Sequence, residues 1–101
     1  MATRLELHEE LVKILGSRNV YFNPPETLKL NYPCIVYSLS SIRKEDADDS
    51  TYKINKAYSI TLIHKDPDND IVDKILLLPM CKFDRPFVSD NLYHYVFTKY
   101  I

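Results

Sequence analysis

The sequence predicts a small α+β domain, an antiparallel sheet of two hairpins with two helices packed on one face. The chain has 101 residues, which is the size of a single domain, so we expect residues 1–101 to fold as one unit. Hydrophobic residues make up 46% of the chain, enough for a folded core. Apolar residues recur at helical spacing in two segments and at strand spacing in others, in the order helix, hairpin, helix, hairpin.

The first helix is expected at residues 4–15. Thr3 and Glu6 have the spacing of a capping box, and Gly16, the only glycine, stands where a helix C-cap favours it. The predicted apolar face consists of Leu7, Leu11, Ile14 and Leu15, with Leu5 and Val12 beside it.

The first hairpin is expected from two segments of alternating pattern. In PCIVYSLSSI, residues 33–42, apolar side chains take every second position, and in YKINKAYSITLIH, residues 52–64, Tyr58, Ile60 and Leu62 do the same. We expect strands near 34–42 and 53–64, with a charged tip at 43–51 between them. Ahead of this hairpin, VYF at 20–22 is interpreted as a short extended piece.

The stretch HKDPDND, residues 64–70, combines one histidine with three acids. A calcium-binding EF-hand loop needs glycine at its sixth position and glutamate at its twelfth, and counted from Asp66 these positions hold Ile71 and Leu77. The residues DPDN are instead typical of a turn, and Asp68 or Asp70 is placed to cap a helix at about 69–78. We therefore expect a strand-to-helix turn and no metal site.

The C-terminal segment predicts the second hairpin. Its strands are expected near 80–87 and 92–100, with the turn at Ser89-Asp90-Asn91.

Composition excludes several classes of function. A net charge of −1 argues against a nucleic-acid binder driven by electrostatics, and a single glycine leaves no glycine-rich phosphate loop. Acids interrupt the N-terminal apolar residues, so no signal peptide is expected, and no stretch approaches the ~20 apolar residues of a membrane span. Cys34 and Cys81 lack CxxC spacing, and we expect buried free thiols in a soluble protein made in the cytoplasm.

Catalytic candidates are few. His8, His64 and His94 are expected to be half-exposed residues without catalytic partners, because no nucleophile elbow and no HxxxH spacing accompany them. Asp84 and Arg85 could form a catalytic pair, but arginine favours carboxylate contacts at interfaces, so an ion pair with each other or between subunits is the preferred interpretation. We expect no enzyme and no cofactor.

The charged tip has two interpretations. It is either a solvated, mobile hairpin end or a loop that orders against an assembly partner. In the second case, basic and acidic residues on its two sides supply complementary charge between subunits. The candidate contact residues are Arg43, Lys44, Asp46, Asp48, Asp49 and Tyr52.

Three blocks of sequence together resemble a known family. They are YPCIVYSLSSI (32–42), ADDSTYKINKAYSITLIHKDPDNDIVDKI (47–75) and CKFDRPFVSDNLYHYVFTKY (81–100). In their order and spacing they are similar to the tail-completion, neck or tail-terminator proteins of long-tailed bacteriophages. The matching positions are Tyr32, Pro33, Ile35, Val36, Tyr37, Ala47, Asp48, Asp49, Tyr52, Asp66, Pro67, Asp68, Phe83, Asp84, Arg85, Asp90, Asn91, Leu92 and His94.

The resemblance implies a structural protein of the virion that forms a ring, commonly of six subunits, at the head-proximal end of the tail tube. Its partners would be further copies of itself, the tail tube protein and the head–tail connector, with no membrane and no sequence-specific nucleic acid. A head-completion or connector adaptor of the neck, a small hydrolase using His64 or His94, and a host regulatory module are the alternatives.

Overall fold

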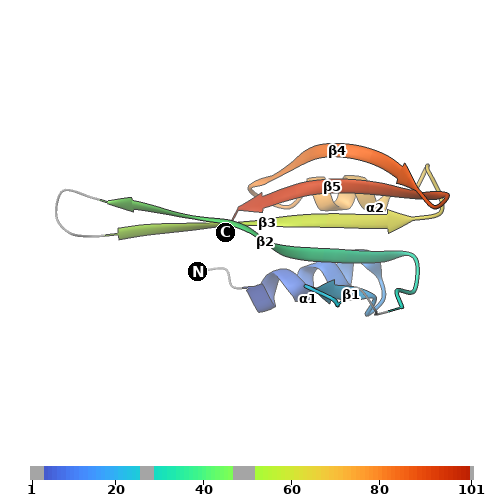
Figure 1. Ribbon diagram of the computed structural model, residues 1–101, viewed down its shortest axis with the longest axis horizontal. Helices are drawn as coiled ribbons and strands as arrows, with labels where there is room; N and C mark the ends of the chain where they lie inside the picture. The colour runs from blue at the N-terminus through green and yellow to red at the C-terminus, as the bar shows by residue number, and fades with distance from the viewer. Residues whose placement is uncertain (1–3, 26–28, 47–51, 101) are drawn as a thin grey trace.

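The computed structural model describes residues 4–25, 29–46 and 52–100, except for the side chains of 45, 46, 52 and 53. It contains five strands and two helices, and Figure 1 shows their arrangement. Thr3 lies outside the described residues, so the predicted capping box is not tested. The elements are α1 (Arg4–Leu15), β1 (Val20–Phe22), β2 (Cys34–Asp46), β3 (Tyr52–His64), α2 (Ile71–Leu76), β4 (Cys81–Ser89) and β5 (Leu92–Tyr100).

The five strands form one mixed sheet in the order β1-β2-β3-β5-β4. Both expected hairpins are present, and β3 joins them by pairing antiparallel with β5. The expectation of a wholly antiparallel sheet is wrong, because β1 pairs parallel with β2, with Val20 opposite Ile35. Three residues with no local partner carry no signal of the strand they will join, so this pairing could not be predicted from the pattern of VYF alone.

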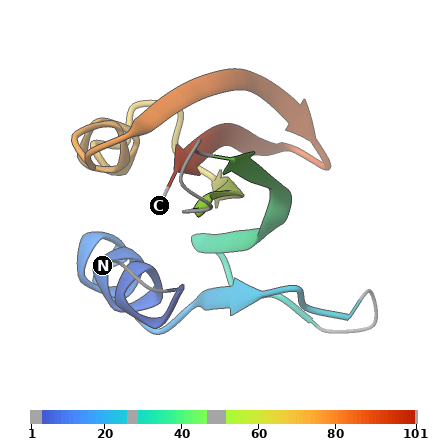
Figure 2. The same cartoon turned by 90° about the vertical axis from the view of Figure 1, so that its left-hand side faces the viewer.

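Both helices lie on the same face of the sheet, as expected, and α1 contacts α2 (Figure 2). They close over one core in which helix and strand residues meet. Leu7 and Leu11 enter it from α1, and Ile75 enters it from α2. The strand residues of the core are Val20, Ile35, Tyr37, Tyr58, Ile60, Leu62 and Phe97.

The bounds of α1 agree with the prediction, and Gly16 adopts the left-handed conformation (φ 77°) expected of a C-cap. Leu5 does not join the apolar face, since it is 64% exposed. The second helix is shorter than expected, spanning Ile71–Leu76 rather than 69–78. Asp70 and Leu77, on either side of it, are its caps instead, and Leu77 is 83% exposed while Leu78 packs against the core.

A polar and aromatic cluster fastens the start of α1 to the sheet. The hydroxyl of Tyr37, whose side chain is buried, lies 2.7 Å from Nδ1 of His8 and accepts a hydrogen bond from Arg4 at 3.2 Å. The guanidinium of Arg4 also lies 4.5 Å from the ring centre of Phe22 in β1. Burial raises the pKa of the Tyr37 phenol above 10.0, so it stays protonated at neutral pH. The cluster ties α1, β1 and β2 together.

Strands β2 and β3 are longer than predicted. They continue to Asp46 and begin at Tyr52, so the outer residues of the expected tip are paired backbone. Strand β5 accompanies β3 only as far as the pair Ala57–Tyr100, and β1 pairs with β2 only at residues 35–37. Among the described residues, the outer part of this hairpin therefore has no neighbouring strand on either side. It projects along the 52 Å long axis of the molecule (Figure 1).

The second hairpin turns where it was predicted. Asp90 (φ 53°) and Asn91 (φ 61°) both take the left-handed conformation that a two-residue type I′ turn requires. Strand β4 forms one edge of the sheet, and a shift of register at Asp84 together with Pro86 interrupts it.

The Tyr37 cluster generates a stability prediction. Tyr37→Phe keeps the buried ring but leaves Arg4 and His8 without their shared partner, so we expect a loss of about 1–2 kcal/mol in the free energy of unfolding. Urea denaturation followed by circular dichroism measures it. Tyr58→Phe, which removes a hydroxyl from the same aromatic group without touching Arg4 or His8, is the matched control. Equal stability of Tyr37→Phe and the wild type would contradict the anchoring role.

Candidate assembly interface

The projecting part of the first hairpin is the most distinctive surface of the molecule. We call it the arm and define it as residues 41–46 of β2 and 52–56 of β3. Pairing is continuous through it, with Ile42 opposite Lys56 and Lys44 opposite Ile54. Ile42 and Ile54 are 58% and 59% exposed, which is unusual for aliphatic side chains on a paired strand. The arm thus exposes apolar groups that a partner could cover.

The arm begins at an irregularity of β2. The register with β3 shifts between Leu39 and Ser41, and the hydroxyl of Ser40 donates a hydrogen bond of 3.2 Å to the carbonyl oxygen of Ala57. A bulge of this kind bends a strand and increases its twist. It separates the buried half of the hairpin from the exposed half.

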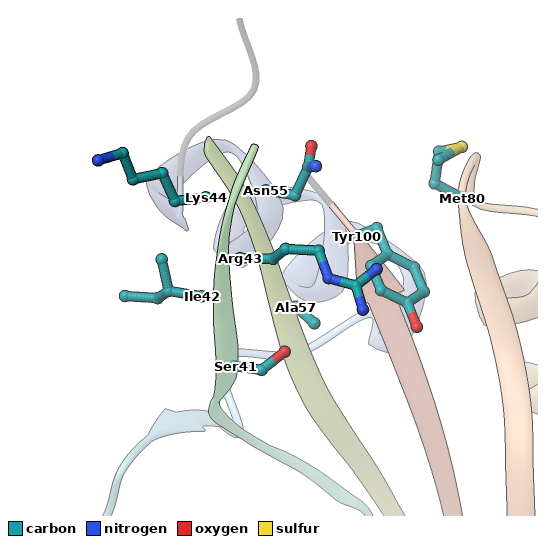
Figure 3. A pocket seen from close by; sticks show the side chains of 8 residues that line it. All are labelled: Ser41, Ile42, Arg43, Lys44, Asn55, Ala57, Met80 and Tyr100. Atoms are coloured by element: carbon teal, nitrogen blue, oxygen red, sulfur yellow. The ribbon is translucent and has the colours of Figure 1, made fainter. Parts of the chain in front are cut away.

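The two faces of the arm differ in chemistry. Figure 3 shows Ile42 and Lys44 pointing to one side of β2, while Arg43 and Ser41 point to the other. Beside the arm lies an open hollow of about 810 Å³, and the residues that line it include Ile42, Arg43, Lys44, Asn55, Met80 and Tyr100. This hollow offers hydrogen-bond donors, an aromatic ring and an exposed thioether on a broad open surface. Such a surface suits another protein better than a small substrate, which binds in an enclosed cleft.

Two physical properties suit the arm to contact with a partner. Its outer edges carry backbone N–H and C=O groups that no described strand satisfies, which is a template for pairing with another chain. A two-stranded hairpin is also only marginally stable on its own in water, so contact with a partner would stabilise it. The arm is therefore a candidate assembly interface.

The predicted contact residues fall partly within the arm. Arg43 and Lys44 are exposed on β2, as the assembly interpretation requires. Asp46 and Tyr52 are paired across the end of the described hairpin, and their side chains are not described. Asp48 and Asp49 lie outside the described residues, so the predicted complementarity between basic and acidic sides stays a prediction.

Sequence reasoning missed the apolar part of this surface. Ile54 lies in step with Tyr58, Ile60 and Leu62 along the strand, but it is exposed whereas they are buried. The signal that distinguishes it is its neighbour Lys56 on the same face of the strand, at a position where a core strand would carry an apolar residue. Met80 and Tyr100 reach the hollow only through the fold, and no local pattern indicates them.

The stretch HKDPDND forms a hydrogen-bonded turn. The backbone N–H of Asp66 donates to Nδ1 of His64, and that of Asp68 donates to the carboxylate of Asp66, both at 2.9 Å. The hydroxyl of Tyr95 donates to the carbonyl oxygen of Pro67 at 3.3 Å and ties the turn to β5. Within the described residues, no three His, Cys, Asp or Glu side chains are grouped so as to hold a metal ion. The stretch has the contacts of a strand-to-helix connection.

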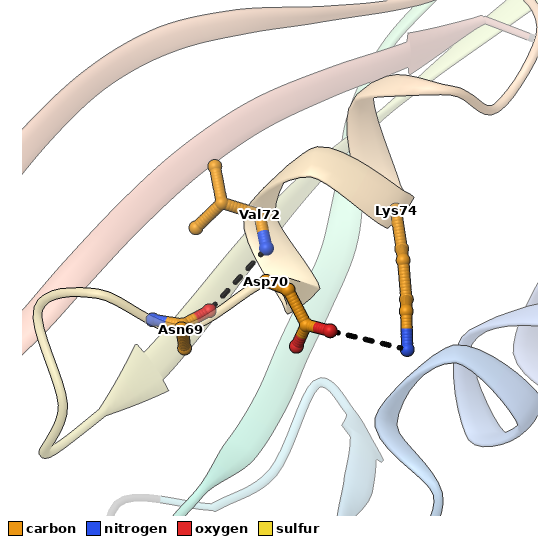
Figure 4. A network of polar contacts seen from close by, with 4 residues as sticks. All are labelled: Asn69, Asp70, Val72 and Lys74. Carbon is orange, nitrogen blue, oxygen red and sulfur yellow. Dashed lines mark hydrogen bonds and ion pairs between the residues drawn. The ribbon is translucent and has the colours of Figure 1, made fainter.

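The cap of α2 agrees with the prediction in position but not in its hydrogen bond. Asp70 is the N-cap residue, but its side chain makes no capping hydrogen bond, and it instead forms an exposed ion pair of 3.7 Å with Lys74. The capping oxygen belongs to Asn69, which accepts from the N–H of Val72 at 3.3 Å (Figure 4). The expectation of an aspartate at the N-cap is confirmed for Asp70 by position, but the capping hydrogen bond comes from Asn69.

The three histidines have separate structural contacts. His8 belongs to the Tyr37 cluster, and His64 accepts the N–H of Asp66 in the turn. His94 stacks on the ring of Phe87 at 4.5 Å between centres and places Nδ1 3.1 Å from the carbonyl oxygen of Leu92. Among the described residues, none of them is paired with a carboxylate in the manner of a general base.

Asp84 and Arg85 do not pair with each other in the part of the chain that the structure describes. The carboxylate of Asp84 accepts a hydrogen bond of 2.5 Å from the hydroxyl of Thr98, and the guanidinium of Arg85 lies 6.0 Å from the ring centre of Phe87. Both are exposed on β4, so a contact with another subunit stays a prediction.

Both cysteines are free thiols, as expected. Cys34 is fully buried, and burial raises the pKa of its thiol from 9.0 to about 11. Cys81 is only half-buried, so the expectation of burial holds fully for Cys34 alone. Burial raises the pKa of Cys81 as well, against a weaker opposing effect of the nearby Lys99. Neither has the lowered pKa of a reactive nucleophile.

No protein-family model matches the chain, and no curated protein sequence matches it. Across the described residues, neither helix has the length and apolar character that crossing a membrane requires.

The capping role of Asn69 can be tested by substitution. Asn69→Ala removes the acceptor for Val72 and the amide that donates to the carbonyl oxygen of Asp66 at 2.9 Å, so we expect a loss of about 1 kcal/mol in the free energy of unfolding. Asp70→Ala removes only an exposed ion pair and should change stability by less than about 0.5 kcal/mol. Chemical denaturation compares the two. A larger effect at Asp70 than at Asn69 would reverse the assignment of the cap.

Proposed function

We propose that this chain is a structural protein of the virion of a long-tailed bacteriophage. In this role it is a tail terminator that forms a ring at the head-proximal end of the tail tube and joins the tube to the head connector. The observation that carries the proposal is the arm, a paired hairpin that projects from a folded body with open edges and exposed isoleucines. The three sequence blocks that resemble tail-completion proteins are the reason for proposing a phage tail as the assembly in which this surface is used.

The body and the arm have different tasks in this proposal. The body contains the core and needs no partner to bury Ile60, Leu62 or Phe97. The arm carries Ile42 and Ile54 in solvent, and covering them gives an assembly a favourable free energy that the free subunit lacks. Association thus adds stabilising contacts to a domain that is already folded.

Ring formation fits the shape of the chain. A projecting element on one end of a subunit contacts a different surface of the next subunit, which is a head-to-tail contact, and such contacts give a ring when the rotation between subunits closes. In this proposal the ring also ends the growth of the tail tube, because one face of the ring covers the end of the tube and the other face remains for a different partner.

Removing the outer arm tests this role. Deletion of residues 45–50 leaves the whole core in place, together with the β2–β3 pairs from Ile35–Leu62 to Ser41–Ala57. We therefore expect the free energy of unfolding to change by no more than about 0.5 kcal/mol. Attachment of heads to tails should be lost in an assembly reaction scored by electron microscopy. Native mass spectrometry of the wild type, with and without purified tail tubes, should show a closed ring. Full head–tail joining by the deletion variant would refute the assembly role of the arm.

Alanine at both His64 and His94 separates assembly from hydrolysis. Their contacts are local, so the double variant should fold and join heads to tails at wild-type yield. The Asn69→Ala variant, which perturbs the same end of the molecule without touching a histidine, is the control for indirect effects on folding. Loss of joining by a stably folded histidine variant would favour a chemical role for these residues.

A further inference from the structure

The hairpin from residue 41 to residue 56 is neutral as a whole, but its charges are separated along its length. Its inner part, residues 41–44 and 54–56, carries one arginine and two lysines and no acid. Its outer part, residues 45–53, carries four acids and one lysine. Two such hairpins that overlap in opposite directions bring the acidic part of each beside the basic part of the other, whereas hairpins that lie side by side in the same direction bring like charges together.

The edge of β3 that faces away from β2 is open along the arm. Strand β5 pairs with β3 from His64 to Ala57 and ends there, with Tyr100 opposite Ala57. Among the described strands, residues 52–56 of β3 then pair with β2 alone. We call these five residues the open edge. They offer backbone groups to a strand of the same length.

The rules of antiparallel pairing limit how two copies of one edge can meet. Opposite residues must point their side chains to the same face of the sheet, so a two-fold axis between the copies passes through one residue, which lies opposite its own copy. On the edge of β2, residues 43–46 are all charged, and each would meet its own charge at the axis. A register centred on Ile42 reaches the bulge at Ser40 after one further pair. The edge of β2 is therefore poorly suited to pairing with itself.

The open edge of β3 has a register without these conflicts. Its midpoint is Ile54, which is uncharged and 59% exposed. With the axis there, Ile54 lies opposite Ile54 of the second copy, and Lys53 lies opposite Asn55. Tyr52 lies opposite Lys56. No like charges meet, and all five residues of the open edge are paired.

The other registers of the open edge fail for charge or for space. An axis at Lys53 sets two lysines opposite each other. An axis at Asn55 places Lys53 opposite Ala57, whose open side Tyr100 of β5 already occupies. An axis at either end of the open edge keeps a single residue pair within it. Charge and space together thus select the register centred on Ile54.

The open hollow beside the arm lies at the inner end of the open edge. Ala57 and Tyr100, whose pair ends the contact between β3 and β5, both line it, and none of the described residues that line it is acidic. Arg43 also lines it and is exposed, and Figure 3 shows its side chain directed to the side on which Tyr100 lies. When two hairpins overlap in opposite directions, the acidic outer part of the second copy arrives at this hollow, beside the charge of Arg43.

We propose that two copies of this chain join by their arms, with the open edge of β3 in one copy paired antiparallel to the same edge of the other and Ile54 on the two-fold axis. We call this contact the clasp. The two exposed isoleucines cover each other, and the backbone groups of both open edges gain partners. Each arm projects from one end of its body, so the two bodies lie at opposite ends of the pair.

The clasp goes beyond the proposed function. It is closed once two copies have met, so it differs from the head-to-tail contact of a ring and joins either two single copies or two rings. Five residue pairs form a small contact, of the size found in complexes that dissociate readily. Such a contact can open when the arm meets another partner.

A thiol at the axis tests the register. In a chain with Cys81→Ser, which leaves only the buried Cys34, Ile54→Cys sets two thiols about 5 Å apart across the clasp. A short bismaleimide should then join two chains. Ile42→Cys is the matched control, because Ile42 is 58% exposed on the other strand of the same arm and lies away from the axis. We expect cross-linking to be at least about tenfold faster at Ile54. Equal rates at the two positions would overturn the clasp.

Substitution by lysine gives a second, independent measurement. Ile54→Lys and Ile42→Lys each set the new charge opposite a lysine of the same hairpin, so their effects on the arm itself are matched. Only Ile54→Lys sets two like charges on the axis. Sedimentation velocity over a concentration series should therefore show Ile54→Lys at half the mass of the wild type and Ile42→Lys at the wild-type mass. Circular dichroism establishes that both variants fold.

A wild type that does not pair at any concentration, or equal masses for the two lysine variants, would also overturn the clasp. If cross-linking follows the prediction but the wild type ignores tail tubes, the proposed function fails while the clasp stands. If the wild type joins tail tubes and Ile54→Lys keeps its mass, the reverse holds.

Discussion

The burial of one half of β3 is the constraint on which the rest of the structure depends. Over residues 57–63 this strand pairs with β2 on one side and β5 on the other, and its side chains Tyr58, Ile60 and Leu62 belong to the core that both helices enter. Those contacts fix the register of both hairpins, because a shift by one residue would turn the apolar set toward solvent. The other half of the same strand is held only by β2, and its position follows from the buried half. The arm is therefore a direct continuation of the core strand, held by its pairing with β2.

The sequence predicts most of the elements and little of their outer boundaries. Residues with strong local signals were placed correctly, including α1 with Gly16 at its end and the turn at Asp90-Asn91, because left-handed backbone conformations select for a few residue types. The parallel pairing of β1 and the length of the arm were missed. Both depend on which segments meet in three dimensions, and a charged stretch such as RKE carries no local signal that distinguishes a paired strand from a loop.

In the candidate site, too, some residues could be predicted from the sequence and others depend on the tertiary fold. Arg43 and Lys44 were singled out from the sequence by charge alone, and the structure places them on the arm. Ile42 carries no local signal of its exposure and Ile54 only the neighbouring Lys56, because alternation predicts a buried face and does not say where the layer that buries it ends. The helices extend over only part of the sheet, and this limit is a property of the whole fold. Exposed isoleucines beyond such a limit are informative only once the fold is known.

The irregular edge at β4 has a consequence for the behaviour of the protein at high concentration. Pro86 offers no N–H, and the shift of register at Asp84 breaks the regular spacing of the groups on either side of it. A chain of another molecule could add to this edge only over short stretches, and the exposed charges of Lys82 and Arg85 would oppose a flat stack. The sheet is thus protected at β4 against uncontrolled strand addition of the kind that leads to amyloid-like fibres. The open backbone edges of the arm, in contrast, carry no proline and no such interruption among the described residues.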